Sequence, residues 1–317
     1  MPSEFDLIRR HFLEPAFTRP HVLTSIGDDC ALLDALPENH ALAISTDTLV
    51  SGVHFLESAS PDLIASRAMR VSISDLAAMG AAPYGFTLAL SVPDFDEEWI
   101  SGFAGGVHAT ARAFDIPLIG GDTTRGPLTI TVTVLGKVDK GAALRRNGAK
   151  LGDAVFVTGS LGDGAAALTL LQTHKLEENP YLHERYYQPD VDLVLGKRLS
   201  KLANSAIDVS DGLLADLQHI LSASGVGAEL KLESLPIAKT TATLAANTAQ
   251  SQEWALIGGD DYRLCVTMPA EAAEDVSLAD NQLIRIGTIV AETGIRLLDA
   301  CGDAVELPHT LGYDHVH

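Results

Sequence analysis

The chain has 317 residues, of which 46% are hydrophobic and 20% are charged. This composition is typical of a globular protein and excludes a disordered chain, and the length indicates about two domains. The formal net charge of -20 argues against binding to nucleic acids or anionic membranes, because proteins that bind them need basic surfaces.

Cysteine usage and the first residues point to a reducing compartment. Cys30, Cys265 and Cys301 are odd in number and show no CxxC spacing, so we expect neither a disulfide framework nor a cysteine-based zinc site. The opening stretch MPSEFDLIRRHF is charged and amphipathic, and no run reaches the ~18 apolar residues of a membrane span. These features predict a cytoplasmic protein.

The first part of the chain alternates predicted helices and strands. Pro61 opens a helical pattern that ends at Gly80, and β-branched residues alternate through LTITVTVLGKV as in a strand. In chain order we predict a helix over 4–14, a strand over 40–50 that ends in a polar turn, a helix over 61–79, a strand over 83–92, a helix over 96–114, a strand over 117–122 that runs into a tight glycine turn, and a strand over 128–138.

A basic, glycine-bearing segment, DKGAALRRNGAKLGD (139–153), marks a change in composition. We place the domain junction there, which gives domains over 1–140 and 141–317. Beyond the junction we predict a strand over 154–159, a helix over 165–176, a strand, turn and helix over 204–225, a strand-turn-strand unit over 253–269, and a strand over 282–290. Strands and helices alternate in both parts, which indicates an α/β or α+β architecture.

Aspartates recur beside the predicted strand ends, mostly next to Gly, Ser or Thr. They are Asp28 and Asp29 in IGDDC, Asp47 in STDT, Asp75 in SISDL, Asp122 in GGDTTRG, Asp208 and Asp211 in DVSDG, and Asp260 and Asp261 in GGDDY. Aspartates on tight turns are stiff oxygen ligands of the kind that magnesium binds.

Each of these turns also has a structural explanation. Asp208 and Asp211 could cap the helix that begins near Leu213, and Asp75 could be a surface residue inside a helix. The set as a whole favours a metal site.

Several well-known phosphate-binding and catalytic motifs do not occur in the sequence, including Walker A, GxGxxG, HExxH and GxSxG. The loop GSLGDG (159–164) either connects a strand to a helix or presents backbone N–H groups to a phosphate. His54 is either structural or a ligand contact. Arg145 and Arg146 either belong to a solvated linker or reach a phosphate, whose oxygens suit the planar guanidinium.

A series of segments follows a fixed order along the chain: GDDCALL, ISTDTLVSGVHF, SDLAAMGA, LIGGDTTRGPL, VTGSLGDGAAAL, AIDVSDGLLADLQHI, GGDDYRL and GYDHV (312–316). The series resembles the signature segments of bacterial thiamine-monophosphate kinases and covers essentially the whole chain. LIGGDTTRG and AIDVSDGL together are the most specific. The wider superfamily is that of aminoimidazole ribonucleotide synthetase.

The resemblance implies a two-domain α/β (α+β) fold. Its N-terminal ATP- and magnesium-binding domain has a mainly four-stranded sheet that pairs across a homodimer, and its C-terminal domain is α/β. It also implies that ATP and thiamine monophosphate give ADP and thiamine diphosphate, with several Mg²⁺ ions as cofactors. The second pKa of a phosphate monoester is about 6, so the acceptor is largely ionised and no general base or other catalytic side chain is expected.

The resemblance also carries over functional residues by motif position. The implied metal ligands are Asp29, Ser45, Thr46, Asp47, Asp75, Asp122, Asp208 and Asp211. The implied contacts to ATP or its metals are Gly121, Asp122, Arg146 and Ser210. The implied contacts to thiamine monophosphate are His54, Asp260 and Tyr313. One departure is that the family usually has Glu at the position of Asp260 and an acidic residue near Arg263, which puts the contact to the thiamine ring in doubt.

Two other functions stay open on the sequence alone. One is another ATP-dependent member of the superfamily, such as an aminoimidazole ribonucleotide or selenophosphate synthetase; the latter tend to carry a reactive cysteine near the N-terminus, and Cys30 follows the acidic pair here. The other is a non-catalytic acidic metal-binding protein. The run LIGGDTTRG favours the kinase over another member of the superfamily. The complete set of aspartates argues against a non-catalytic protein.

Overall fold

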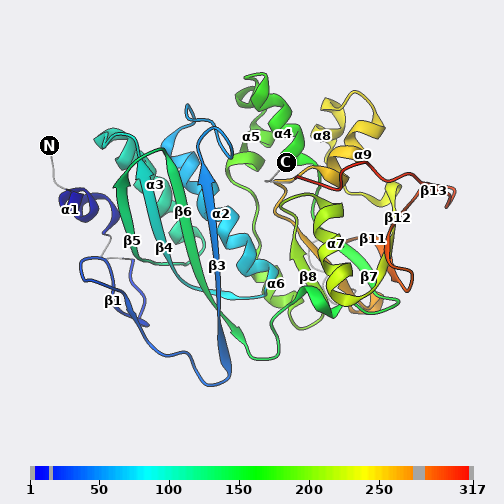
Figure 1. The fold of residues 1–317 in the computed structure, drawn as a ribbon, viewed down its shortest axis with the longest axis horizontal. Helices are drawn as coiled ribbons and strands as arrows, with labels where there is room; N and C mark the ends of the chain where they lie inside the picture. Colours follow the sequence, from blue (N-terminus) through cyan, green and yellow to red (C-terminus); the bar gives the residue numbers. More distant parts are fainter. Residues whose placement is uncertain (1–3, 14–16, 274–282, 314–317) are drawn as a thin grey trace. The chain divides into compact units, whose positions relative to one another are not determined.

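The computed structural model describes residues 4–13, 17–273 and 283–313 (Figure 1). The chain divides into two compact units, Met1–Leu76 with Ala81–Gly141 and Ala77–Gly80 with Ala142–His317. Residues 314–316 of the GYDHV segment and the last residue of the helix predicted over 4–14 lie outside the described residues.

A four-stranded sheet with the order β3-β6-β4-β5 forms the centre of the first unit. Its strands are β3 (His40–Val50), β4 (Ala82–Val92), β5 (Leu118–Arg125) and β6 (Thr129–Asp139). β4 and β5 are parallel, and the other neighbours are antiparallel. The helices α2 (Pro61–Ala78) and α3 (Glu97–Ala113) cover one face (Figure 1), and the side chains of Ile73, Phe86 and Phe103 are fully buried.

Before this sheet, the chain forms short elements. They are α1 (Glu4–Leu7), the π-helical turn η1 (Ile8–Phe12), and the antiparallel pair β1 (Val22–Thr24) and β2 (Leu32–Leu33).

The other face of the four-stranded sheet, which we call the open face, is exposed along β3. Successive side chains of a strand point to opposite faces, so Leu42, Ile44, Thr46 and Thr48 share this face. Leu42 and Ile44 are 45% and 62% exposed. The hydroxyls of Thr46 and Thr48 each pair at 2.9 Å with a threonine hydroxyl of β6.

Two turns predicted in this unit are wrong. The strand predicted over 40–50 is confirmed as β3, but Asp47 lies inside it and not in a turn, and β5 continues through the Gly-Gly pair to Arg125 where a tight turn was predicted. Gly121 instead allows β5 to approach β4 closely, because a Cβ at this position would lie 2.0 Å from the carbonyl oxygen of Leu88. The helix predicted over 61–79 is confirmed as α2, and its stop at Gly80 has a left-handed φ of 66°.

The second unit contains a seven-stranded sheet with the order β13-β12-β9-β11-β7-β10-β8. Its strands are β7 (Ala154–Thr158), β8 (Ser205–Asp208), β9 (Gly227–Lys231), β10 (Leu264–Met268), β11 (Leu283–Val290), β12 (Gly294–Leu298) and β13 (Ala304–Val305). Only β9 and β12 pair in parallel among these neighbours. The helix α7 (Leu213–Ser224) contacts β8, β10 and β12 and contributes Leu217 and Ile220 to the core.

The remaining helical segments of this unit include several that the sequence did not indicate. They are η2 (Arg146–Gly148), α4 (Asp163–Gln172), η3 (Leu176–Glu178), α5 (Pro180–Tyr187), α6 (Leu193–Leu199), η4 (Leu232–Ser234), α8 (Lys239–Leu244), α9 (Thr248–Ile257) and η5 (Ala270–Ala273). The first strand predicted within 253–269 is wrong: EWALI ends α9, which Asn247 caps by accepting the N–H of Gln250 at 3.0 Å. Across the described ranges, no helix is long and apolar enough to cross a membrane.

Candidate functional site

In the first unit, β3 and α2 bring three of the predicted metal ligands together. Ser45 and Asp47 alternate onto the face that the helices cover, and the hydroxyl of Ser45 donates a hydrogen bond to the carboxylate of Asp75 on α2. Asp75 is half-buried, so it is not merely a surface residue of its helix. Thr46 points to the open face, away from these three side chains, and its hydroxyl pairs with Thr133.

Asp47 is a half-buried carboxyl group with an unusual environment. Its pKa is raised to about 6, first by burial and then by the charge of Asp75, while a hydrogen bond from Ser72 acts in the opposite direction. Its Oδ2 atom is buried and has no hydrogen-bond partner among the described residues. A buried carboxylate oxygen beside a second carboxylate is costly unless a cation or a proton compensates it. The donor set therefore fits a hard divalent cation, which prefers oxygen ligands.

A cleft of about 980 Å³ in the first unit collects a second group of the predicted residues. Asp28, Asp29 and the stretch 118–123 line it, so the cleft holds Gly121 and Asp122 as well. Asp122 pairs with Ala89 in the parallel register of β4 and β5, which places it on the open face, opposite to Asp47. The residues of the described ranges form no cluster of three or more His, Cys, Asp or Glu side chains with metal-site geometry.

His54 follows β3 and has a fixed ring. Its Nδ1 atom accepts the backbone N–H of Val50 at 3.0 Å, and its carbonyl oxygen accepts from Nε of the buried Arg67 at 3.0 Å. Because Nδ1 is an acceptor, the neutral imidazole carries its proton on Nε2. This tautomer can donate a hydrogen bond to an anionic ligand.

In the second unit, the DVSDG segment forms a tight turn between β8 and α7. Asp208 ends β8 and is buried. The carboxylate of Asp216 accepts the backbone N–H groups of Ser210, Asp211 and Gly212 at 3.0, 3.0 and 3.2 Å. Burial raises the pKa of Asp216 to about 6, although these N–H groups favour its anion. The N-cap of α7 is Gly212, without a side-chain cap, so capping by Asp208 or Asp211 is not their role.

Two other segments converge on this turn and bring four predicted residues together. The N–H of Asp260 donates to the carbonyl oxygen of Ser210 at 2.8 Å, and the N–H of Tyr313 donates to that of Asp211 at 2.9 Å. Glycines permit this approach, because a Cβ at Gly259 or Gly312 would lie 2.4 Å from one of these two carbonyl oxygens.

Arg146, the remaining predicted ATP contact, lies on η2. Its side chain is exposed, and its carbonyl oxygen accepts the hydroxyl of Ser224 at 3.0 Å.

The GSLGDG loop proves to bind a carboxyl group of the protein itself. The carboxyl group of Asp261 accepts the N–H groups of Gly162 at 2.7 Å and Gly164 at 3.1 Å, at the start of α4. These donors are the ones that a phosphate at this helix end would use. Asp261 therefore fixes this connection between β7 and α4. The sequence motif GGDDY did not reveal that the loop is the partner of Asp261.

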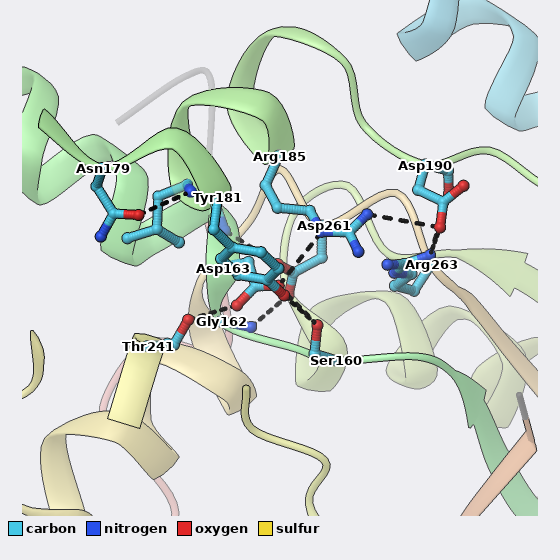
Figure 2. Close-up of polar contacts among 12 residues, drawn as sticks. Ser160, Gly162, Asp163, Asn179, Tyr181, Arg185, Asp190, Thr241, Asp261 and Arg263 are labelled. Carbon is cyan, nitrogen blue, oxygen red and sulfur yellow. Dashed lines mark hydrogen bonds and ion pairs between the residues drawn. The ribbon is translucent and has the colours of Figure 1, made fainter. Parts of the chain in front are cut away.

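A polar network surrounds this loop (Figure 2). Asp163 accepts hydrogen bonds from Ser160 and Tyr181, both at 2.6 Å, and from Thr241. Arg263 donates to the carboxylate of Asp190 at 2.8 Å, and Arg185 lies 3.5 Å from the same carboxylate. Burial alone would raise the pKa of Asp190, but the two arginines outweigh it and lower the pKa.

Comparison with known proteins connects both units to one family. The model of the AIR synthase related protein N-terminal domain matches residues 27–138, and that of the C-terminal domain matches residues 150–299. Thiamine-monophosphate kinase from Escherichia coli (strain K12) is 44% identical over 321 residues, which cover 99% of this chain and 98% of that protein.

Two solved structures share the fold over nearly the whole chain. Thiamine-monophosphate kinase from Stenotrophomonas maltophilia K279a has 43% identity and a TM-score of 0.84, covering 95% of this chain and 96% of that one. The structure described as "AaThiL complexed with AMPPCP and TMP" has 30% identity and a TM-score of 0.80, covering 98% of this chain and 95% of that one.

Proposed function

The chain belongs to the thiamine-monophosphate kinases of the AIR synthase related family, and on this premise we propose how its residues serve the transfer of the γ-phosphoryl group of ATP to thiamine monophosphate. Donor and acceptor are both anionic phosphates. Such a transfer depends mainly on positioning and on charge neutralisation. The acceptor phosphate is itself largely ionised at neutral pH, because its second pKa is about 6, so no side chain has to remove a proton.

Magnesium ions, when bound, would supply the positive charge that brings the two phosphates together. The observation that carries their assignment is the buried Oδ2 of Asp47, which lacks a hydrogen-bond partner among the described residues. Asp47, Asp75 and Ser45 would hold one ion on the helix-covered face of the first unit. The hydroxyl of Thr46 pairs with Thr133 on the other face, so any role of Thr46 falls to its backbone carbonyl. The other proposed metal ligands are Asp29, Asp122, Asp208 and Asp211.

The chain's polar groups would orient the two substrates. For ATP and its metals, we assign Gly121, Asp122, Arg146 and Ser210. Gly121 lets β5 lie against the backbone of β4 and so fixes the neighbouring Asp122 at the cleft.

For thiamine monophosphate, we assign His54, Asp260 and Tyr313. The proton on Nε2 of His54 suits donation to a phosphate oxygen. Asp260 accepts the hydroxyl of Tyr262 at 2.8 Å, which fixes its carboxylate although it is shorter than the usual Glu.

The open face of the first unit supports a homodimer. Leu42 and Ile44 are exposed beside two pairs of threonine hydroxyls, and exposed apolar surface of this kind favours association. We assign residues 1–140 to ATP and magnesium binding and to dimerisation, and residues 141–317 to the C-terminal α/β domain. The cysteine usage supports a cytoplasmic enzyme, and the acidic composition supports one that binds neither nucleic acids nor anionic membranes.

The acceptor is the part of this proposal that an assay tests directly. Purified protein with ATP and magnesium is given thiamine monophosphate, thiamine or aminoimidazole ribonucleotide precursors in parallel, and products are separated by chromatography. We expect ADP and thiamine diphosphate in equal amounts from thiamine monophosphate alone. ATP turnover with another acceptor, and none with thiamine monophosphate, would assign the chain to a different reaction of the superfamily.

A further inference from the structure

The turn that carries Asp260 has an unusual backbone. Asp260 and Tyr262 have φ values of 67° and 50°, in the left-handed region that residues with bulky side chains seldom adopt. The turn meets the DVSDG segment through two backbone hydrogen bonds, from Asp260 to Ser210 and from Tyr262 to Val209, both at 2.8 Å. A conformation of this kind persists only where the surroundings hold it in place.

Asp261 lies between these two residues, and its side chain fixes the turn to a second segment, the loop at the start of α4. Its side chain is buried, and both carboxyl oxygens accept backbone N–H groups of the loop before α4, those of Gly162 and Gly164. The fit is tight, since a Cβ at Gly164 would lie 2.2 Å from the carbonyl oxygen of Gly259. Asp261 thus ties the turn to the start of a helix.

Arg263, which follows the turn, anchors the same segment through its side chain. Its guanidinium packs under Gly159, where a Cβ would lie 2.9 Å from Cζ, and donates to Asp190. Asp163 lies at the start of α4 and is also buried, and Figure 2 shows its partners Ser160, Tyr181 and Thr241. None of these partners belongs to the turn over 259–262. The two aspartates therefore differ in whether they hold the turn.

We propose that Asp261 is a positioning residue for thiamine monophosphate: its buried carboxyl group clamps the turn over 259–262 to the start of α4 and so holds Asp260 in its substrate-binding conformation. The inference rests on the proposed contact of Asp260 with the substrate. An intact clamp lowers the KM for thiamine monophosphate, whereas the ATP site has no residue on this turn.

Asp261→Asn tests the clamp, because an amide nitrogen cannot accept the second N–H group. Asp163→Asn is the matched control: it perturbs the same loop without removing a hydrogen bond to the turn. We expect Asp261→Asn to raise the KM for thiamine monophosphate about tenfold or more, equivalent to one lost hydrogen bond, with the KM for ATP changed less than about twofold. Asp163→Asn should leave the KM for thiamine monophosphate within about twofold. An unchanged KM in folded Asp261→Asn, or an equal rise in both variants, would overturn the proposal.

Amide hydrogen exchange of the wild-type protein tests the clamp without any variant that has to fold. The N–H groups of Gly162, Gly164 and Tyr262 should exchange at least about 100-fold more slowly than exposed loop amides. Exchange as fast as in an exposed loop would overturn the clamp. If these amides are protected but Asp260→Ala leaves the KM for thiamine monophosphate unchanged, the proposed substrate contact fails, and with it the substrate role of Asp261.

Discussion

Asp47 is half-buried and Asp261 is buried, and both carboxyl groups have raised pKa values, but their partners differ. Both oxygens of Asp261 accept backbone N–H groups, whereas Oδ2 of Asp47 has no hydrogen-bond partner among the described residues. The protein alone therefore satisfies Asp261, whereas Oδ2 of Asp47 is left for a cation or a proton. This contrast separates a carboxyl group that the protein itself binds from one that we propose binds a metal ion.

The titration of Asp261 predicts how stability depends on pH. Burial raises its pKa from 3.8 to about 8. Between these two values the native state keeps a proton that the unfolded chain has released, so the free energy of unfolding falls as the pH rises. Urea unfolding of the wild type between pH 5 and pH 8, expressed relative to Asp261→Asn, should show this decline, because the variant lacks the titrating group. Parallel pH profiles of the two proteins would contradict the raised pKa.

Between β4 and β5, one glycine shapes the cleft that Asp29 and Asp122 line. Gly121 lies where a Cβ would overlap the backbone of Leu88, whereas nothing lies within 4 Å of a Cβ at the adjacent Gly120. The two glycines of LIGGD therefore have different structural roles although they are neighbours in one strand. Gly121 is required by the strand pairing, and Gly120 is not.

This difference predicts the effects of two alanine substitutions. Gly121→Ala forces β4 and β5 apart and should lower the free energy of unfolding by about 1–3 kcal/mol, the usual cost of overpacking. Gly120→Ala should change it by less than about 0.5 kcal/mol, as open positions do. Urea denaturation followed by circular dichroism measures both. Equal effects of the two substitutions would show that the strand contact is not tight.

Helices and strands are predicted well from the sequence where hydrophobic periodicity is strong, and poorly where tertiary contacts decide the local conformation. The pattern over 61–79 and the alternation over 128–138 correspond closely to α2 and β6. Aspartate next to threonine at Asp47, and next to glycine at Asp122, suggested turns, but strand pairing with β6 and β4 overrides that local preference. The short apolar run EWALI fits a strand or a helix equally, and the cap at Asn247 decides for the helix.

The candidate site shows the same limit. The order of the sequence segments alone indicated the candidate aspartates, since each of them lies in a segment that resembles a family signature. It could not show that the side chains of Asp47 and Asp122 lie on opposite faces of one sheet, which depends on strand register. Nor could it show that the second aspartate of GGDDY fills the helix end of the GSLGDG loop, since these segments are about a hundred residues apart.

For the whole molecule, the open face of the first unit predicts the oligomeric state. Ile44→Asp places a charge among exposed apolar residues and should convert a dimer into a monomer, because a buried unpaired charge opposes association. Val194→Asp is the matched control, since Val194 is also exposed, at 73%, but lies in the second unit. Light scattering should give twice the chain mass of 33.5 kDa for the wild type and the control, and a single chain mass for Ile44→Asp. A monomeric wild type, or a dimeric Ile44→Asp, would contradict the assignment.

The magnesium dependence of thiamine diphosphate formation, measured for the wild type and for Asp47→Asn, tests the central claim most directly. We expect chelation to abolish wild-type activity and folded Asp47→Asn to need about 10–100-fold more magnesium, a loss as large as that caused by removing outer-shell partners of metal ligands. Wild-type activity that survives chelation, or a folded Asp47→Asn with an unchanged magnesium requirement, would show that the carboxylate of Asp47 does not hold the metal.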